Sequence, residues 1–250
     1  MTAKPWFINF NRLSRGKSFA RPEMRLFCFP HAGGSAAWFH GFSRALPQGF
    51  ELWAANLPAH GSRLGETPMT DLNAAADRLA AALVPLIDGI PFVFLGHSMG
   101  ARLAFEVARF LRSWRIDMPI QLVVSACPAP QLPGHERGWY NLSDNQLVAE
   151  LRKYGGLPEE LLKHEPQTVA LFLPALRADL RMFETAKYRQ EQPLAIPIIA
   201  LGSNRDPLVD VKELEAWQDQ TSRQFRLALF DGDHFFLHAA QKAILEKVVR

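Results

Sequence analysis

The chain has 250 residues, of which 48% are hydrophobic and 21% charged, and this length and composition are typical of one soluble α/β domain. A net charge of +3, with Lys and Arg scattered along the sequence, argues against nucleic acid as a partner. The N-terminus lacks the apolar core of a signal peptide, and no apolar run approaches the length of a membrane span. Cys28 and Cys127 lie in apolar, strand-like segments, which predicts buried free thiols in a reducing compartment. We therefore expect a cytoplasmic protein without nucleic-acid or membrane partners.

Strand-like and helix-like segments alternate along most of the sequence. A short edge strand or an anchored arm is expected near the N-terminus, around Trp6 and Phe10, and Asp71 is a plausible N-cap for a long helix. The alternation predicts a mostly parallel central sheet with helices on both faces. The buried strands are expected at residues 25–30, 51–56, 92–95, 120–126, 196–201 and 225–230, and the helices at 38–46, 72–87 and 211–218, directly after Ser98 and at the C-terminus.

The segment Pro91–Ala108 contains the most informative motif. It consists of an apolar strand, the turn G-H-S-M-G and a helical pattern, and it matches the nucleophile elbow G-x-S-x-G with Ser98 at the apex. Strand and helix pass so close in such a turn that side chains at Gly96 and Gly100 would clash. Ser98 is therefore the predicted nucleophile. The N–H of Met99, at the start of the helix, is predicted to stabilise a negatively charged oxygen.

A second backbone donor is expected in the Gly-rich loop His31-Ala-Gly-Gly34, which directly follows the first buried strand. A hydrolase with a nucleophile elbow takes its second oxyanion donor from the loop after an earlier strand. The position of this loop favours the N–H of Ala32. The alternative is a plain turn that serves only the geometry of the chain.

Ser98 requires a general base, because an unassisted hydroxyl is a poor nucleophile at neutral pH. In this arrangement the acid and the base follow the serine in the order Asp or Glu, then His, at the carboxyl ends of later strands. Of the eight histidines, His234 is the one that lies in the loop directly after the final expected strand, where it can reach back over the sheet, so it is the predicted base. His97 lies beside the serine in the elbow, where its ring is expected to face away. His31 and His60 precede Ser98 and are expected to shape the pocket.

Asp206 is the predicted acid that orients His234. It lies at a suitable distance after the first strand that follows the helical part of the chain, whereas the loop after the preceding strand has no nearby carboxylate. Asp231 and Asp233 are too close to His234 in the sequence for an easy head-on bond to its Nδ1 atom. The alternative for Asp206 is an ordinary turn residue before proline.

A long helical insertion interrupts the alternation between about residues 131 and 190 of what we expect to be a single domain, 1–250. Its helical patterns fall at 144–154, 159–164 and 167–188. This position predicts a lid over the site, with an ordinary helical subdomain as the alternative. The last pattern has more apolar residues than one buried face needs, so Leu176, Leu180 and Phe183 are predicted to line a groove for a hydrophobic ligand.

Motifs along nearly the whole chain carry a resemblance to a known family. They are F-P-H-A-G-G (29–34), G-H-S-M-G (96–100), Y-G-G-L-P-E-E-L-L (154–162), F-L-P-A-L-R-A-D-L-R-M-F-E-T (172–185) and D-G-D-H-F-F (231–236). Together they resemble a type II thioesterase, one of the discrete α/β-hydrolases that accompany nonribosomal peptide and polyketide synthetases. The two motifs in the insertion are much more specific than G-x-S-x-G, which by itself indicates only a hydrolase.

The resemblance implies the triad Ser98, Asp206 and His234, with oxyanion N–H groups at Ala32 and Met99. It implies removal of mis-primed or stalled acyl groups from the phosphopantetheine arms of carrier proteins, through an acyl-enzyme and under a mobile lid. No metal or cofactor is expected, because phosphopantetheine belongs to the partner. We expect the protein to be a monomer.

The sequence departs from the family pattern at one loop. Members usually carry P-G-R after the second strand, whereas this chain has Pro58-Ala-His-Gly-Ser-Arg63. The departure leaves the local role of Arg63 open and does not affect the triad.

Other functions of the same fold remain as alternatives. A small-molecule esterase or acyltransferase would use the same triad and would prefer simple esters to carrier-bound thioesters. A non-catalytic binding module is disfavoured because such proteins usually lose a triad member, and all three candidates are present. A fused chain-terminating thioesterase domain is disfavoured because the sequence begins with Met1 and has no carrier domain.

Overall fold

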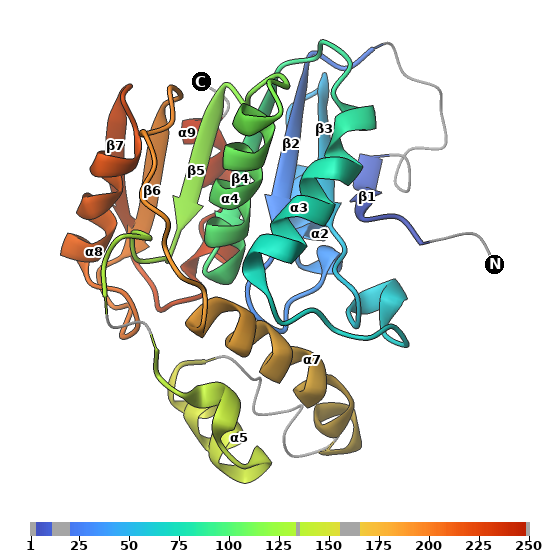
Figure 1. Cartoon of the computed structure of the whole chain (residues 1–250), viewed down its shortest axis with the longest axis vertical. Coiled ribbons are helices and arrows are strands. Elements are labelled where there is room, and N and C mark those ends of the chain that lie inside the picture. The colour runs from blue at the N-terminus through green and yellow to red at the C-terminus, as the bar shows by residue number, and fades with distance from the viewer. Residues whose placement is uncertain (1–3, 12–20, 134–135, 156–165, 249–250) are drawn as a thin grey trace.

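The computed structural model describes residues 4–11, 21–133, 136–155 and 166–248. Within them one seven-stranded sheet has the order β1-β3-β2-β4-β5-β6-β7. β1 is antiparallel to β3 at one edge and all other neighbours are parallel, as the sequence predicts (Figure 1). The strands are β1 (Phe7–Asn9), β2 (Met24–Phe29), β3 (Phe50–Ala55), β4 (Phe92–His97), β5 (Gln121–Ser125), β6 (Ile198–Ser203) and β7 (Phe225–Phe230).

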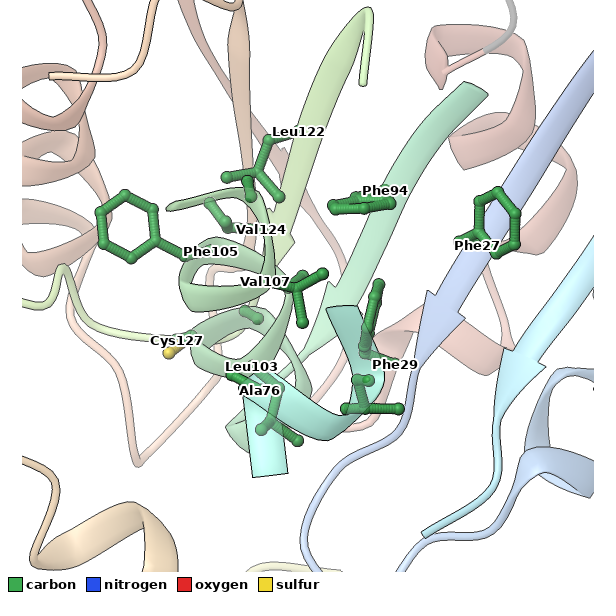
Figure 2. Packing of buried hydrophobic residues seen from close by; sticks show 14 of the residues in the cluster. Phe27, Phe29, Ala76, Phe94, Leu103, Phe105, Val107, Leu122, Val124 and Cys127 are labelled. Atoms are coloured by element: carbon green, nitrogen blue, oxygen red, sulfur yellow. The ribbon is translucent and has the colours of Figure 1, made fainter. Parts of the chain in front are cut away.

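Helices cover both faces of the sheet because both faces are apolar. Successive residues of a strand point to opposite sides. Phe94 and Val124 therefore pack against α3 and α4 on one face (Figure 2). Val93 and Val123 face α2 and α9 on the other face. The α-helices are α2 (His40–Ala45), α3 (Leu72–Leu83), α4 (Met99–Ser113), α5 (Asp144–Lys153), α7 (Pro166–Glu184), α8 (Val211–Glu215) and α9 (Gln241–Val248). Short 3-10 helices span Ala36–Phe39, Gly61–Arg63, Val84–Leu86, Trp139–Asn141, Ala216–Gln220 and Phe236–His238.

The helix expected at 72–87 is shorter than predicted. Asp71 caps it by accepting a hydrogen bond from the N–H of Ala74 at 2.8 Å, as the sequence indicates. The α-helix then gives way to the 3-10 helix Val84–Leu86. Pro85 lies in this turn, and proline has no N–H with which to continue an α-helix.

The helical insertion is the part of the chain between β5 and β6. No strand occurs in the portion of it that the structure describes, and α5 confirms the helical pattern expected at 144–154. α7 confirms the pattern expected at 167–188 as far as Glu184, where the helix ends four residues earlier than predicted. The pattern expected at 159–164 lies outside the described residues. α5 and α7 pack against each other through Leu147, Leu151 and Leu173 among others, beyond the carboxyl ends of the parallel strands (Figure 1).

Two further properties follow from the described residues. Cys28 and Cys127 are buried free thiols, as predicted. None of the helices in the described ranges has both the length and the apolar character that a membrane crossing requires.

The turn between β4 and α4 brings the helix against the sheet. A Cβ atom on Gly96 would overlap the carbonyl oxygen of Gly100, and one on Gly100 would overlap the carbonyl oxygen of Phe29 at the end of β2. The atoms in the way are backbone atoms, which cannot rotate aside. Glycine is therefore required at both positions, which confirms the steric role predicted from the sequence.

Replacing Gly100 with Ala should destabilise the protein by about 3 kcal/mol or more, because β2 and α4 would have to separate. Gly65→Ala is the matched control, since a Cβ atom at Gly65 meets nothing within 4 Å. Urea unfolding followed by circular dichroism measures both variants. Equal stability of the two variants would show that β2 and α4 do not approach as closely as described.

Candidate active site

Ser98 occupies a strained turn between β4 and α4. Its backbone has φ 54° and ψ −123°, a combination that residues other than glycine rarely adopt. The N–H of Ser98 donates a hydrogen bond to the carbonyl oxygen of Ser125 at 2.7 Å, so the turn is tied to the end of β5. The serine side chain is thereby held at the carboxyl edge of the sheet, where the predicted partners also lie.

His234 connects Ser98 to Asp206. Its Nε2 atom lies 3.1 Å from Ser98 Oγ, and its Nδ1 atom lies 2.9 Å from Asp206 Oδ2. A carboxylate only accepts hydrogen bonds, so Nδ1 carries the proton and Nε2 is left to accept from the serine hydroxyl. The side chains of His234 and Asp206 are 6% and 1% exposed, and the N–H of Leu208 donates to the second carboxylate oxygen at 2.8 Å. The structure thus brings together the three side chains that the sequence singles out.

Two residues that share a cavity with Ser98 have backbone N–H groups without a partner in the described part of the chain. Met99 is the first residue of α4, so its N–H has no partner within the helix. Ala32 lies in the turn after β2, and both residues line the same cavity as Ser98. Neither N–H has a hydrogen-bond partner among the residues that the structure describes. Two free donors next to a serine hydroxyl can stabilise negative charge on a bound carbonyl oxygen.

The cavity at Ser98 has a volume of about 80 Å³ and lies between the sheet edge and the insertion. Leu180 and Phe183 of α7 line it, as predicted, whereas Leu176 and His31 are not among its lining residues. Leu176 packs against Gly33 instead. The remaining lining residues are Ala32, Ser98, Met99, Ala126, Pro128, Arg137, Trp139, Glu184, Leu208, Val209 and His234. In the described part of the chain, no three His, Cys, Asp or Glu side chains are arranged to hold a metal ion.

Comparison with known proteins identifies the family. The model of the thioesterase domain matches residues 24–250. The chain belongs to the thioesterase domain family. It is 39% identical over 241 residues to the gramicidin S biosynthesis protein GrsT of Aneurinibacillus migulanus, over 96% of this chain and 91% of that protein. It is 36% identical over 215 residues to the thioesterase PikA5 of Streptomyces venezuelae, over 86% of this chain and 76% of that protein.

Solved structures of other thioesterases have the same fold as this thioesterase. The type II thioesterase BorB from the borrelidin biosynthetic cluster has a TM-score of 0.88 and 36% identity, over 100% of this chain and 98% of that chain. The likeness confirms the α/β-hydrolase fold and the type II thioesterase resemblance that the sequence motifs indicate.

Two buried histidines, His97 and His31, lie near the site of this thioesterase. His97 donates to or accepts from Ser125 Oγ at 3.1 Å, and its ring stacks on Trp38, so it faces away from the serine hydroxyl as expected. Burial lowers the pKa of His97 well below its usual range. Burial, together with the charges of nearby histidines, lowers the pKa of His31 to about 3. His97 and His31 are therefore neutral at neutral pH and place no positive charge beside His234.

A buried ion pair that was not predicted from the sequence lies next to this site. Asp179 of α7 accepts hydrogen bonds from His60 Nε2 at 2.9 Å and from the N–H of Gly33 at 2.7 Å. Burial acts to lower the pKa of His60, but the hydrogen bond and charge of Asp179 outweigh it and raise that pKa above its usual value. An acidic residue between the apolar Ala178 and Leu180 is the sequence signal that would have indicated a buried carboxylate here.

Glu184 is a second buried carboxyl group that the sequence analysis did not identify. It lines the cavity one turn after Leu180 and accepts hydrogen bonds from the N–H groups of Gly138 and Trp139 at 2.6 and 3.2 Å. Burial raises its pKa, although these two donors act in the opposite direction. Its contacts tie α7 to the beginning of the insertion.

The structure also shows what Arg63 does. Its guanidinium donates to the carbonyl oxygen of Asn56 at 2.9 Å and to Glu66 at 2.6 Å, and it lies 4.3 Å from the ring centre of Trp6. These contacts brace the loop after β3 from within. Arg63 therefore holds the loop that carries His60 and does not line the cavity.

Replacing His60 with Gln should lower stability in a pH-dependent way. The folded-state pKa of His60 is raised, so its ion pair contributes fully below the ordinary histidine pKa of about 6.5. The contribution is lost as pH rises through the raised folded-state pKa. We expect the loss in free energy of unfolding caused by His60→Gln to be larger at about pH 6 than at about pH 9, as measured by urea denaturation. A loss that is constant or grows with pH would show that His60 is neutral in the folded protein.

Proposed function

We propose that this thioesterase hydrolyses mis-primed or stalled acyl groups from the phosphopantetheine arms of carrier proteins in nonribosomal peptide or polyketide synthesis. The observation that carries the proposal is the hydrogen-bonded series Ser98, His234 and Asp206 at the edge of the cavity. Three relatives support the substrate class: GrsT is a gramicidin S biosynthesis protein, PikA5 is a thioesterase, and BorB is a type II thioesterase from the borrelidin biosynthetic cluster. The proposed mechanism uses residues of one copy of the chain, and we propose that the protein acts as a monomer.

The first half of the reaction forms an acyl-enzyme. Ser98 Oγ attacks the thioester carbonyl carbon while His234 Nε2 takes the hydroxyl proton, and Asp206 stabilises the resulting imidazolium. The N–H groups of Ala32 and Met99 donate to the carbonyl oxygen as it becomes negative. Collapse of the tetrahedral intermediate breaks the carbon–sulfur bond. His234 then returns its proton to the departing phosphopantetheine sulfur.

The second half releases the acid. A water molecule attacks the ester carbonyl of acyl-Ser98 while His234 Nε2 takes one of its protons. The same two N–H groups stabilise the second tetrahedral intermediate. Its collapse breaks the bond to Ser98 Oγ, which recovers its proton from His234, and a carboxylic acid leaves. No group outside the chain and water is needed to balance the reaction.

The insertion forms the outer wall of the site and acts as a lid in this proposal. Leu180, Phe183 and Trp139 close the cavity from that side. In this proposal α7, or the side chains on it, move when the acyl group and the thiol end of the arm enter. Hinge movement of such a segment would also expose the site to the carrier protein.

Replacing Asp206 with Asn should lower kcat on an acyl-carrier protein by up to about 10⁴-fold, because the amide favours the wrong tautomer of His234. Asp233→Asn is the matched control. Asp233 is an exposed acid next to His234 whose carboxylate accepts from the N–H of Phe235 at 2.8 Å, so its kcat should stay within about threefold. Mass spectrometry of the carrier protein measures acyl release.

The same assay separates the proposed function from its alternatives. The acyl group is offered on a carrier protein, on a minimal thiol and as an ethyl ester. The proposal expects a much higher kcat/KM on the carrier protein than on the other two. Faster turnover of the ethyl ester would favour a small-molecule esterase, and normal turnover by Asp206→Asn with loss in Asp233→Asn would identify Asp233 as the acid.

Leu180→Trp should shift the preference toward short acyl chains. The larger side chain fills the cavity, so kcat/KM for a medium-length acyl group should fall by about tenfold or more relative to acetyl. Leu171→Trp is the control on the same helix, because Leu171 is 66% exposed. Competition between acetyl and octanoyl carrier proteins provides the measurement. An unchanged ratio of acetyl to octanoyl turnover in Leu180→Trp would show that this cavity does not select the acyl group.

A further inference from the structure

The carboxylate of Asp179 joins three distant segments of the chain. It lies on α7 and is 2% exposed. A single oxygen, Oδ2, accepts from the N–H of Gly33 at 2.7 Å and from His60 Nε2 at 2.9 Å. Gly33 belongs to the turn after β2 and His60 to the loop after β3. The mechanism described above uses neither Asp179 nor His60, although both lie next to the turn that carries Ala32.

The partner of Asp179 is a cation. His60 Nδ1 lies 2.9 Å from the carbonyl oxygen of Pro58, which can only accept, and Nε2 lies against a carboxylate, which also only accepts. Both ring nitrogens therefore carry protons, in agreement with the raised pKa of His60. The side chains of His60 and Asp179 are 4% and 3% exposed, so removal of one charge leaves the other buried and unpaired.

Asp179 faces the central peptide of a tight turn. The N–H of Gly34 donates to the carbonyl oxygen of His31 at 2.9 Å, and Gly33 has φ 75°, whereas Ala32 has no positive φ. These features define a type II turn over His31–Gly34. Its central peptide directs the Gly33 N–H to the carboxylate. A flip to type I would direct the Ala32 carbonyl oxygen at the same carboxylate, which would repel it.

α7 contacts this turn through a second residue. Leu176 lies three positions before Asp179, on the same face of the helix. A Cβ atom on Gly33 would come within 2.9 Å of Leu176 Cδ1, so the leucine packs directly on the glycine backbone. One turn of α7 thus supplies both an apolar contact and a charged acceptor to the loop that carries Ala32.

We propose that Asp179 is a positioning residue. It couples the packing of α7 to the geometry of the turn His31–Gly34, here called the oxyanion turn. The inference rests on the proposed function, in which the Ala32 N–H stabilises the oxyanion. When α7 is seated, Asp179 fixes the Gly33 peptide and Ala32 is held toward the carbonyl oxygen at Ser98. When α7 moves away, the turn loses its acceptor. The oxyanion site is then complete only while the insertion covers the substrate.

Asp179→Ala should lower kcat on an acyl-carrier protein by about 10- to 100-fold, a smaller effect than the loss of an oxyanion donor itself. KM should change by less than about threefold. The affinity for a trifluoromethyl ketone analogue of the acyl group should fall by the same factor as kcat/KM. Such a ketone forms a tetrahedral adduct with the serine and requires the oxyanion N–H groups, whereas a carrier protein with a non-hydrolysable amide reports ground-state binding.

Arg177→Ala is the matched control on the same helix. Arg177 donates to the carbonyl oxygens of Tyr140 and Leu142 at 2.7 and 2.5 Å and pairs with Asp144 at 2.6 Å, so it anchors α7 within the insertion and does not contact the oxyanion turn. Its loss should raise KM and leave kcat and ketone affinity within about threefold. Equal losses of kcat in the Asp179 and Arg177 variants would show that Asp179 only anchors the insertion.

A second variant keeps the test decisive if Asp179→Ala does not fold. Asp179→Asn preserves the volume and one acceptor oxygen but removes the charge that holds His60. It should lower kcat and ketone affinity in parallel, by about threefold or more. Wild-type kcat and ketone affinity in a folded Asp179 variant would overturn the inference. Failure of the wild-type protein to release acyl groups from carrier proteins would instead overturn the proposed function.

Discussion

The close approach of β2, β4 and α4 around the Ser98 turn is the constraint on which the rest of the structure depends. Gly100 on α4 lies directly against the carbonyl of Phe29, with no room for a side chain. β2 continues from Phe29 into the turn that carries Ala32. The same backbone contact therefore positions both Ser98 and Ala32, the proposed second oxyanion donor. A hydroxyl and two N–H groups from separate segments can converge on one carbonyl group only if this contact is held closely.

The sequence predicted most of the fold and three of the site residues because these depend on order along the chain. Parallel strands end at one edge of the sheet, so a serine after β4, an acid after β6 and a histidine after β7 must meet there. Ser98, Asp206 and His234 were found in this way, and their hydrogen bonds have the lengths that the arrangement requires. The strand positions followed from short apolar runs between turn residues. Pro85 ended one helix earlier than its apolar spacing indicated.

Contacts that depend on how a helix is rotated about its own axis could not be predicted in the same way. Helical spacing showed that α7 has several apolar residues, but it did not show which of them face the cavity. Leu180 and Phe183 line the cavity, whereas Leu176 faces the oxyanion turn. The pair Asp179 and His60 is separated by 119 residues and has no motif of its own. Only the packing of α7 on two loops brings these charges together and away from water.

The central claim is that Ser98 carries the acyl group between its transfer from the arm and its hydrolysis. The direct measurement is rapid mixing of the thioesterase with an acyl-carrier protein, acid quenching within a turnover, and mass spectrometry of proteolytic peptides. The account predicts an acyl mass on the peptide that contains Ser98 and on no peptide of Ser98→Ala. In Asp206→Asn the acylated peptide should accumulate when water attack is slowed more than acyl transfer. An acyl group on a different residue, or persistent turnover by Ser98→Ala, would contradict it.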